Sequence, residues 1–380
     1  MIGVIADDLT GAAEIGAVGW RHGLRAEIVL AGEPSKDAGL VCVDTDSRSC
    51  DPTEAAQRAG NAALLLKTCG AEWIYKKTDS LLRGNVTREI ESIVKQLGLS
   101  GALLVPANPS LGRTVVNGQY FVRGQLIHQT EFARDPKHPR SSPNVLELLD
   151  KPSALLLSVG KSGEPFPKHG IVIGEVASSD ELRKWARLRD KNWLVAGGAE
   201  FFGALLKPGA TNPKSSYSHG KELFVCGSAS EVTRNFVARQ AERGVPVFSL
   251  PQELAADGSF DAGRLNSLVD HVVASFQTAP RVIIHIGLPR VKDVAGAEML
   301  ALHLVRVAEV VLRRANAGHV FAEGGATAVA LARCMGWKRL NVIAELAPGV
   351  VTLAVTDGGL PLMFTVKPGS YAWPESLRHP

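Results

Sequence analysis

The sequence predicts an α/β protein of two domains, each built on a largely parallel β-sheet flanked by helices. Short apolar runs of four or five residues alternate with helical patterns along the whole chain, as in parallel sheets covered by helices. The 380 residues exceed what one hydrophobic core commonly holds. A turn-rich stretch without periodicity, residues 207–219, resembles a linker, so we expect domains over residues 1–217 and 218–380.

The composition argues against several classes of protein. The 42 lysines and arginines exceed the 38 aspartates and glutamates by only four, and no basic run is longer than two residues, so neither nucleic acid nor a membrane surface is an expected partner. Five cysteines without CxxC spacing fit a reduced, cytoplasmic protein. Asp7 and Asp8 interrupt the first apolar stretch, so we expect no signal peptide. Apolar segments also fall short of the ~20 residues that a membrane span needs.

In the first half, glycine, proline or polar residues bound each apolar run and so set the expected elements. Gly23 ends the first helix, and the second begins with Asp51 as its cap and Pro52 at its first position. Residues 112–143 differ, because a hairpin near 118–124 leads into a long loop of the kind that often carries function. We expect strands at 2–6, 26–30, 40–43, 73–75, 102–105, 155–159, 170–173 and 193–196, and helices at 12–22, 52–69, 86–97 and 179–188.

The second half repeats this alternation after the linker. Its first strand, 222–226, breaks at a glycine and a serine before a helix begins, and a later strand breaks at two glycines. We expect strands at 222–226, 245–250, 281–286, 320–322, 340–345, near 353 and at 362–366, and helices at 231–243, 296–315 and 328–335.

Three groups of charged residues directly follow strands of the first half. One aspartate after the opening strand could simply cap the next helix, since Asp is a favoured N-cap. The carboxyl ends of parallel strands meet at one edge of a sheet, where ligands bind in open α/β folds, so we expect the three groups to share one crevice. The groups are Asp7 and Asp8; Asp44, Asp46 and Arg48; and Lys77, Asp79, Ser80 and Arg83.

These residue types suit a polar, anionic sugar acid as the ligand. Arg48, Lys77 and Arg83 can pair with a carboxylate, an arginine doing so through two hydrogen bonds. Ser80 and Asn108 can bond hydroxyl groups, and one remaining acid can remove a hydroxyl proton. Salt bridges and caps at strand ends are the simpler interpretation of each group alone, whereas three groups in register favour a binding site.

Two turns of the second half, residues 227–230 and 323–327, join a strand to a helix and contain glycine. Glycine lets a phosphate approach the backbone, and the free N–H groups at a helix start bind anions. Neither turn fits GxGxxG or GxxxxGK[ST], so each alone is a weak signal. Together with Lys367 and Gly369 they favour a nucleotide phosphate. The histidines show no metal-binding spacing, so we expect no structural metal.

Taken together, these motifs resemble those of the four-carbon acid sugar kinases, which are ATP-dependent kinases of threonate, erythronate and 3-oxo-tetronate type substrates. The resemblance covers nearly the whole chain. It rests on residues 5–12 (IADDLTGA) and 76–85 (KKTDSLLRGN), which are specific. It also rests on residues 106–118, in which residues 112–118 (GRTVVNG) are close to the family pattern. Less specific pairs follow in the family order, namely Asp135–Pro136, Gly227–Ser228, Gly324–Gly325 and Pro348–Gly349.

The resemblance implies an N-terminal sugar-acid-binding domain and a C-terminal nucleotide-binding domain across a cleft, with phosphate passing from ATP to the terminal hydroxyl of a four-carbon acid. Asp8 or Asp79 would be the base, and the sequence leaves that choice open. Mg²⁺ bridging the phosphates is implied, because phosphoryl transfer needs their charge neutralised. The implied substrate-binding residues are Asp7, Asp8, Arg48, Lys76, Lys77, Thr78, Asp79, Ser80 and Arg83. The implied nucleotide-binding residues are Ser228, Gly324, Gly325, Ala326, Thr327, Gly349 and Gly369.

The chain departs from the family pattern in two places. The family usually has Gly-Gly-Asp-Thr where residues 324–327 are Gly-Gly-Ala-Thr, so a carboxylate is missing, and Lys-Ser-Gly is replaced by residues 367–369, Lys-Pro-Gly. Two other functions therefore stay open. One is a sensor that binds nucleotide and sugar acid without turnover. The other, less favoured, is a phosphatase with an aspartyl nucleophile, since residues 44–46 have the DxD pattern. The sequence fixes neither the stereochemistry of the substrate nor whether the chain forms a homo-oligomer.

Overall fold

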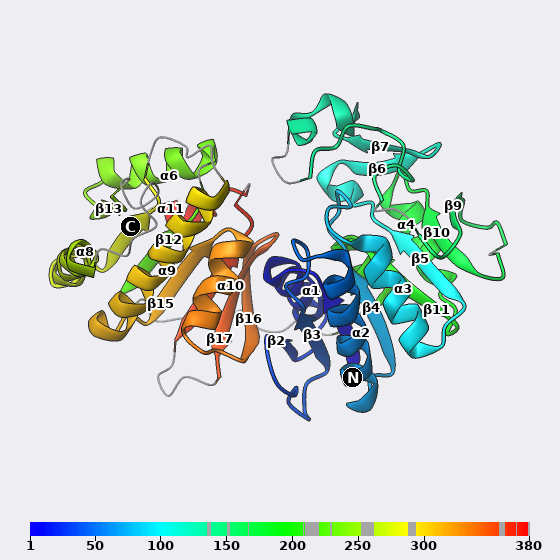
Figure 1. Ribbon diagram of the computed structural model, residues 1–380, viewed down its shortest axis with the longest axis horizontal. Helices are drawn as coiled ribbons and strands as arrows, with labels where there is room; N and C mark the ends of the chain where they lie inside the picture. Colours follow the sequence, from blue (N-terminus) through cyan, green and yellow to red (C-terminus); the bar gives the residue numbers. More distant parts are fainter. Residues whose placement is uncertain are drawn as a thin grey trace. The chain divides into compact units, whose positions relative to one another are not determined.

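The chain separates into two compact units, an N-terminal unit (Met1–Asn212) and a C-terminal unit (Pro213–Pro380), each an α/β fold in the computed structural model (Figure 1). The predicted class, with a largely parallel sheet in each half, is confirmed. The units part a few residues before the predicted boundary at 217. The structure describes residues 1–134, 138–149, 153–165, 167–207, 209, 220–228, 230–251, 262–287, 294–356, 362–369 and 371–378.

The sheet of the N-terminal unit has the strand order β2-β3-β1-β4-β11-β5-β10-β9, and each neighbouring pair is parallel. Its central strands are buried along almost their whole length because helices cover both faces of a parallel sheet. The strands are β1 (Ile2–Ala6), β2 (Ala26–Val29), β3 (Leu40–Asp44), β4 (Trp73–Lys77), β5 (Gly101–Val105), β9 (Leu157–Gly160), β10 (Gly170–Gly174) and β11 (Trp193–Gly197).

Helices α1 (Leu9–Arg21) and α2 (Pro52–Thr68) follow the first and third strands. The start predicted for the first helix, residue 12, was wrong, because Asp8 caps the helix and lets it begin three residues earlier. The second helix begins as predicted, with Asp51 accepting a backbone hydrogen bond from Thr53 at 2.8 Å. Helix α2 packs against α3 (Figure 1). Helix α1 packs against α5. The remaining helices are α3 (Val86–Leu97), α4 (Ser179–Arg187) and α5 (Ala199–Leu205).

A small antiparallel sheet confirms the hairpin predicted near residues 118–124. Tyr120 on this sheet donates its hydroxyl hydrogen bond to the backbone carbonyl of Ser80, which joins the sheet to the loop after β4. The predicted loop residues 135–137 lie outside the described residues. The elements here are β6 (Arg113–Val116), β7 (Gln119–Val122), β8 (Gln125–Leu126) and the short helices η1 (Pro109–Leu111), η2 (Ile127–Gln129) and η3 (Glu131–Arg134).

The C-terminal unit has the strand order β13-β14-β12-β15-β18-β17-β16, parallel from β13 to β18 and antiparallel beyond. Most of the predicted linker, residues 207–219, lies outside the described residues. The strands are β12 (Glu222–Cys226), β13 (Val247–Ser249), β14 (Arg281–His285), β15 (His319–Glu323), β16 (Arg339–Ala347), β17 (Val350–Val355) and β18 (Met363–Lys367).

The helices of this unit include one that the sequence interpretation missed, α8 (Ala262–Ser275). Helix α10 (Gly325–Cys334) begins earlier than the predicted residue 328, directly at the glycine turn. Among the described residues, no helix is both long and apolar enough to cross a membrane. The other helices are α6 (Glu231–Glu242), α9 (Val294–Ala315) and α11 (Glu375–Arg378).

Candidate functional site

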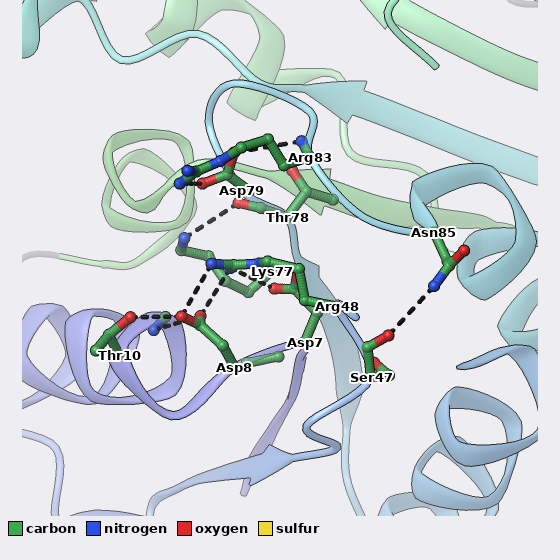
Figure 2. A network of polar contacts seen from close by, with 12 residues as sticks. Asp7, Asp8, Thr10, Ser47, Arg48, Lys77, Thr78, Asp79, Arg83 and Asn85 are labelled. Atoms are coloured by element: carbon green, nitrogen blue, oxygen red, sulfur yellow. Dashed lines mark hydrogen bonds and ion pairs between the residues drawn. The ribbon is translucent and has the colours of Figure 1, made fainter. Parts of the chain in front are cut away.

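Polar and charged residues gather where strands β1, β3 and β4 end. Ala6 at the end of β1 pairs with Asp44 of β3 and with Lys77 of β4, so the three strands end level with one another. Figure 2 shows side chains from the loops beyond these ends close together, with Arg48 among them. The strand register therefore brings the predicted charged groups to one edge of the sheet.

Arg48 joins both acids of the opening stretch. Its Nε donates to Oδ2 of Asp7 at 2.7 Å and its Nη2 to Oδ1 at 2.9 Å. Its Nη1 and Nη2 donate to the two oxygens of Asp8 at 3.0 and 2.8 Å (Figure 2). A guanidinium carries about five N–H groups, so most of them are already used inside the protein. Arg48 thus holds Asp7 and Asp8 in place.

Asp8 is also the N-cap of helix α1. Its Oδ1 accepts from the backbone N–H of Gly11 at 2.9 Å, and its Oδ2 accepts from the hydroxyl of Thr10 at 2.5 Å. A Cβ at position 11 would lie 2.7 Å from Oδ1, so the close approach requires glycine. The cap and the pairing with Arg48 therefore coexist, and each Asp8 oxygen accepts two hydrogen bonds.

The two lysines at the end of β4 serve opposite sides of the sheet, as successive strand residues do. Lys77 Nζ lies 3.1 Å from Oε2 of Glu14 in α1 and donates to the carbonyl of Thr78 at 3.1 Å. Lys76, only 1% exposed, lies 2.6 Å from Oε2 of Glu89 in α3. Lys76 therefore holds α3 to the sheet, and its direct contact with a substrate stays a prediction.

Glu14 and Glu89 are parts of the site that sequence reasoning missed. Glu89 is buried and accepts a second hydrogen bond from the hydroxyl of Ser47 at 2.6 Å. Burial raises the pKa of Glu89, and Lys76 offsets part of that rise. The sequence signal for Glu89 was an acid on the helix face that otherwise packs against the sheet. A buried carboxylate needs a cation beside it, so this position indicates a buried ion pair.

Asp79 forms a local pair with Arg83 four residues later. Nε of Arg83 donates to Oδ2 at 2.8 Å and Nη2 donates to Oδ1 at 3.0 Å. The backbone N–H groups of Leu81 and Arg83 also donate to Oδ2, at 3.1 and 3.3 Å. Burial alone raises the pKa of Asp79, but Arg83, Arg48 and Lys77 outweigh it and hold the pKa well below its usual range.

Asp7 and Lys77 are also held in their ionised forms by the charges around them. Burial raises the pKa of Asp7, but Arg48 and Lys76 outweigh it and lower the pKa. Burial lowers the pKa of Lys77, but the surrounding carboxylates, Glu14 first, raise it above its usual value. The shifts in pKa of Asp7, Asp79 and Lys77 thus all favour the charged form of each group.

Ser80 lies between Asp79 and the small antiparallel sheet. Its hydroxyl accepts a hydrogen bond from Nη1 of Arg113 on β6. Arg113 lies in a segment on which the family resemblance rests, but it was not among the predicted site residues. The structure therefore adds it to the candidate site. Thr78 contributes a buried hydroxyl, 1% exposed as a residue, that has no hydrogen-bond partner among the described residues.

The predicted acids Asp44 and Asp46 do not join this cluster through the contacts that the structure describes. Oδ1 of Asp44 accepts from the backbone N–H of Asp46 at 2.9 Å, and the carbonyl of Asp46 accepts from Arg58 of α2 at 2.9 Å. Asp46 has a left-handed backbone with φ of 43°. This segment forms the turn that delivers Arg48, and the aspartyl-nucleophile alternative gains no support from it.

The predicted phosphate turns of the C-terminal unit lie beside one another. A Cβ at Gly227 would lie 1.9 Å from Oγ1 of Thr327, so the turn after β12 touches the first turn of α10. A Cβ at Gly369 would lie 3.1 Å from Oγ of Ser228 and 3.9 Å from Cα of Gly324. Helix α6, capped by Ser230, and helix α10, capped by Gly324, thus begin at the same place. Gly325 and Ala326 are the first residues of α10.

A buried ion pair supports these turns from within the sheet. Lys367 Nζ lies 2.9 Å from Oε1 of Glu323, and both side chains are 0% exposed. Lys367 also donates to the carbonyls of Pro368 and Tyr371, at 3.2 and 2.6 Å. Oε1 of Glu323 accepts from the hydroxyl of Thr233 in α6. The pair therefore holds the loop after β18, the glycine turn and α6 to one another.

Gly349 lies beside the glycine turns and the Lys367–Glu323 pair rather than among them. It forms the turn between β16 and β17, and a Cβ there would lie 2.8 Å from the ring of Tyr371. Its backbone N–H donates to Oε1 of Glu345 at 3.3 Å. Gly349 thus contacts the loop that carries Gly369, and its own contact with a nucleotide stays a prediction.

The residues near the turns are compatible with an Mg²⁺ ion that a nucleotide carries. Such an ion keeps several water ligands and needs only one or two protein carboxylates. Among the described residues, Oε2 of Glu323 is buried without a hydrogen-bond partner, so one carboxylate oxygen remains available next to the glycine turn. No group of three or more His, Cys, Asp or Glu side chains in the described part of the chain could hold a metal by itself.

Comparison with known proteins assigns both units. Residues 2–205 match the model of a sugar-binding N-terminal domain, and residues 223–371 match that of a nucleotide-binding C-terminal domain. The D-threonate kinase of Salmonella typhimurium is 27% identical, over 91% of this chain and 89% of that protein. The 3-oxo-tetronate kinase of Brucella melitensis is 25% identical, over 97% of this chain and 92% of that protein.

The chain belongs to the four-carbon acid sugar kinase family. Two solved structures have the same fold as this chain. A Salmonella typhimurium protein, 20% identical, superposes with a TM-score of 0.80 over 99% of this chain and 97% of its own. A Haemophilus influenzae protein, 19% identical, gives 0.73 over 98% of this chain and 97% of its own. These two solved proteins thus share the fold of this chain.

Proposed function

We propose that this protein is an ATP-dependent kinase that phosphorylates the terminal hydroxyl of a four-carbon sugar acid of the threonate, erythronate or 3-oxo-tetronate type. The observation that carries the proposal is the meeting of two helix N-termini and the Gly369 loop in the C-terminal unit. Such a set of free backbone N–H groups suits nucleotide phosphates. The curated relatives, which are named as kinases of such acids over nearly the whole chain, support the substrate class.

The N-terminal unit supplies the acceptor side in this proposal. Thr78, Ser80 and Lys77 offer hydrogen-bond donors at the ends of the strands, and Asp79 offers an acceptor for a hydroxyl group. Asp7, Asp8 and Arg48 form the rigid wall behind them, because their hydrogen bonds are made mostly to one another. A wall whose charges are fixed lets the substrate bind without reorganising the protein.

Asp79, rather than Asp8, is the carboxylate that we propose to receive the substrate hydroxyl. Each oxygen of Asp8 already accepts two hydrogen bonds, whereas Oδ1 of Asp79 accepts one from the described residues, donated by Arg83. Because its pKa is low, Asp79 would orient the substrate hydroxyl and accept its proton only after phosphoryl transfer has begun. That order suits phosphoryl transfer, whose transition state is loose and needs little prior activation of the hydroxyl.

The C-terminal unit supplies ATP with Mg²⁺ in this proposal. Ser228, Gly324, Gly325, Thr327 and Gly369 would contact the phosphates, chiefly through backbone N–H groups and hydroxyls. Mg²⁺ would neutralise charge on the phosphates during transfer. Ala326, which stands where the family usually has an aspartate, is exposed in the first turn of α10. The absence of that carboxylate therefore leaves the backbone N–H donors of this turn in place. We expect a cytoplasmic protein, where ATP is present.

A coupled assay of ADP release with a panel of four-carbon acids tests this function. We expect one or more of D- and L-threonate, D- and L-erythronate and the 3-oxo-tetronates to stimulate ADP release above the rate with ATP alone. Calorimetric measurement of ATP and acid binding to the same protein distinguishes a kinase from a sensor. Binding of both ATP and an acid without any ADP release would favour a sensor over a kinase.

A further inference from the structure

The cations at the acceptor edge are almost all paired with the protein's own carboxylates. Arg48 pairs with Asp7 and Asp8, Lys77 with Glu14, and Arg83 with Asp79. These are the residues that the sequence would assign to a substrate carboxylate. Because each of them already has an acid partner, a further carboxylate needs a different cation.

Arg113 provides that cation. Its Nη1 donates to the hydroxyl of Ser80, the residue next to Asp79, and no carboxylate among the described residues lies within ion-pair distance of it. Arg113 is half-buried on β6. Its charge is therefore only partly screened by solvent and is still accessible to a ligand. A half-buried arginine without an acid partner is a ready site for an anion.

The position of Arg113 is fixed by the structure around it. The carbonyl of Ser80 accepts from the hydroxyl of Tyr120 on β7, the strand that pairs with β6 at Arg113 and Val122. The backbone of Arg113 also pairs with Asn108, at 2.8 and 3.1 Å. Arg113 is therefore held by the pairing of β6 with β7, and its hydrogen bond to Ser80 anchors it to the loop that carries Asp79.

We infer that Arg113 binds the carboxylate of the substrate and so decides which end of the acid lies at Asp79. With Nη1 engaged by Ser80, Nε and Nη2 remain for a two-fold hydrogen bond to a carboxylate, the geometry that Arg48 uses on Asp7. The inference rests on the proposed function and deepens it. It makes Arg113 the residue that selects an acid over the neutral sugar alcohol.

The test compares Arg113→Met and Arg113→Lys with the unchanged protein on the best acid of the panel and on its neutral analogue, the matching four-carbon alditol. We expect the KM for the acid to rise about 10- to 100-fold in Arg113→Met, since a charge-assisted hydrogen bond is lost. We expect the weak activity on the alditol to stay within a factor of about two. Arg113→Lys should fall between, because lysine keeps the charge and loses the planar fork.

The control variant is Arg123→Gln, because Arg123 is an exposed arginine in the turn between β7 and β8 of the same small sheet. It should leave both KM values unchanged. Equal loss on acid and alditol in Arg113→Met, or no change on the acid, would overturn the inference. If the unchanged protein releases no ADP with any acid, the proposed function itself fails. Calorimetric binding of the acid to the unchanged protein and to Arg113→Met then decides the role of Arg113 separately.

Discussion

Arg48 donates to both carboxylate oxygens of Asp7, from Nε at 2.7 Å and from Nη2 at 2.9 Å, across 41 residues of sequence. The side chain of Asp7 is only 4% exposed, so this pair fixes a buried charge at the end of the central strand. The same guanidinium holds Asp8, the cap of α1. The acceptor edge is thus organised around an arginine that the protein uses internally.

Replacing Arg48 with Met should destabilise the N-terminal unit. Removing one partner leaves Asp7 charged and buried, which costs about 3–5 kcal/mol in comparable pairs. Urea unfolding measures the free energy of unfolding. Arg25→Met is the control, because Arg25 and Asp37 form an exposed pair worth less than about 1 kcal/mol. Equal effects of the two substitutions would contradict the organising role of Arg48.

Asp79→Asn and Asp8→Asn should separate catalysis from structure. With Asp79 as the hydroxyl acceptor, Asp79→Asn should lower kcat by about 10²- to 10⁴-fold. Asp8→Asn keeps an acceptor for the Gly11 N–H but loses the charge beside Arg48, so its main effect should be a lower Tm. Steady-state kinetics and thermal melts on both variants provide the comparison. A larger loss of kcat in Asp8→Asn would assign the hydroxyl to Asp8.

The contribution of Asp79 to stability should depend on pH in a defined direction. A carboxyl group whose pKa is lowered by folding stabilises the protein above its unfolded pKa of about 4, and this contribution is lost as pH falls through the folded pKa. The difference in free energy of unfolding between the unchanged protein and Asp79→Asn should therefore be constant near neutral pH and shrink at acidic pH. A difference that grows as the pH falls would be inconsistent with the low pKa.

Gly227→Ala should weaken ATP binding. The added Cβ would lie 1.9 Å from Oγ1 of Thr327, so the turn after β12 and the start of α10 would have to move apart. We expect at least about a tenfold rise in the Kd for ATP, equivalent to ~1.4 kcal/mol. Gly318→Ala is the control, since a Cβ there meets nothing within 4 Å. Calorimetry with ATP and Mg²⁺ gives both values, and equal affinity in the two variants would refute the phosphate site.

Much of the fold follows from local patterns in the sequence. Apolar runs bounded by turn residues place β1, β3 and β4, and parallel strand ends bring Asp7, Arg48 and Asp79 to one edge. Helix α8 was missed although Leu265, Val269 and Val272 carry its spacing and are buried.

The partners of each charged residue could not be predicted in the same way. Glu14 and Glu89 come from helices whose rotation depends on packing, so the sequence does not show that they face Lys77 and Lys76. The placement of Arg113 depends on how the small sheet folds back onto the loop after β4. Such long-range contacts are decided by tertiary packing rather than by local propensity.

Phosphorus NMR of the reaction product tests the central claim most directly. The protein is incubated with ATP, Mg²⁺ and each four-carbon acid in turn, and the spectrum is followed over time. The account predicts that, with at least one acid, the γ-phosphate signal is replaced by a phosphomonoester signal coupled to the protons of a terminal CH₂ group. Release of inorganic phosphate alone, or an unchanged ATP spectrum with every acid while ATP and acid both bind, would contradict it.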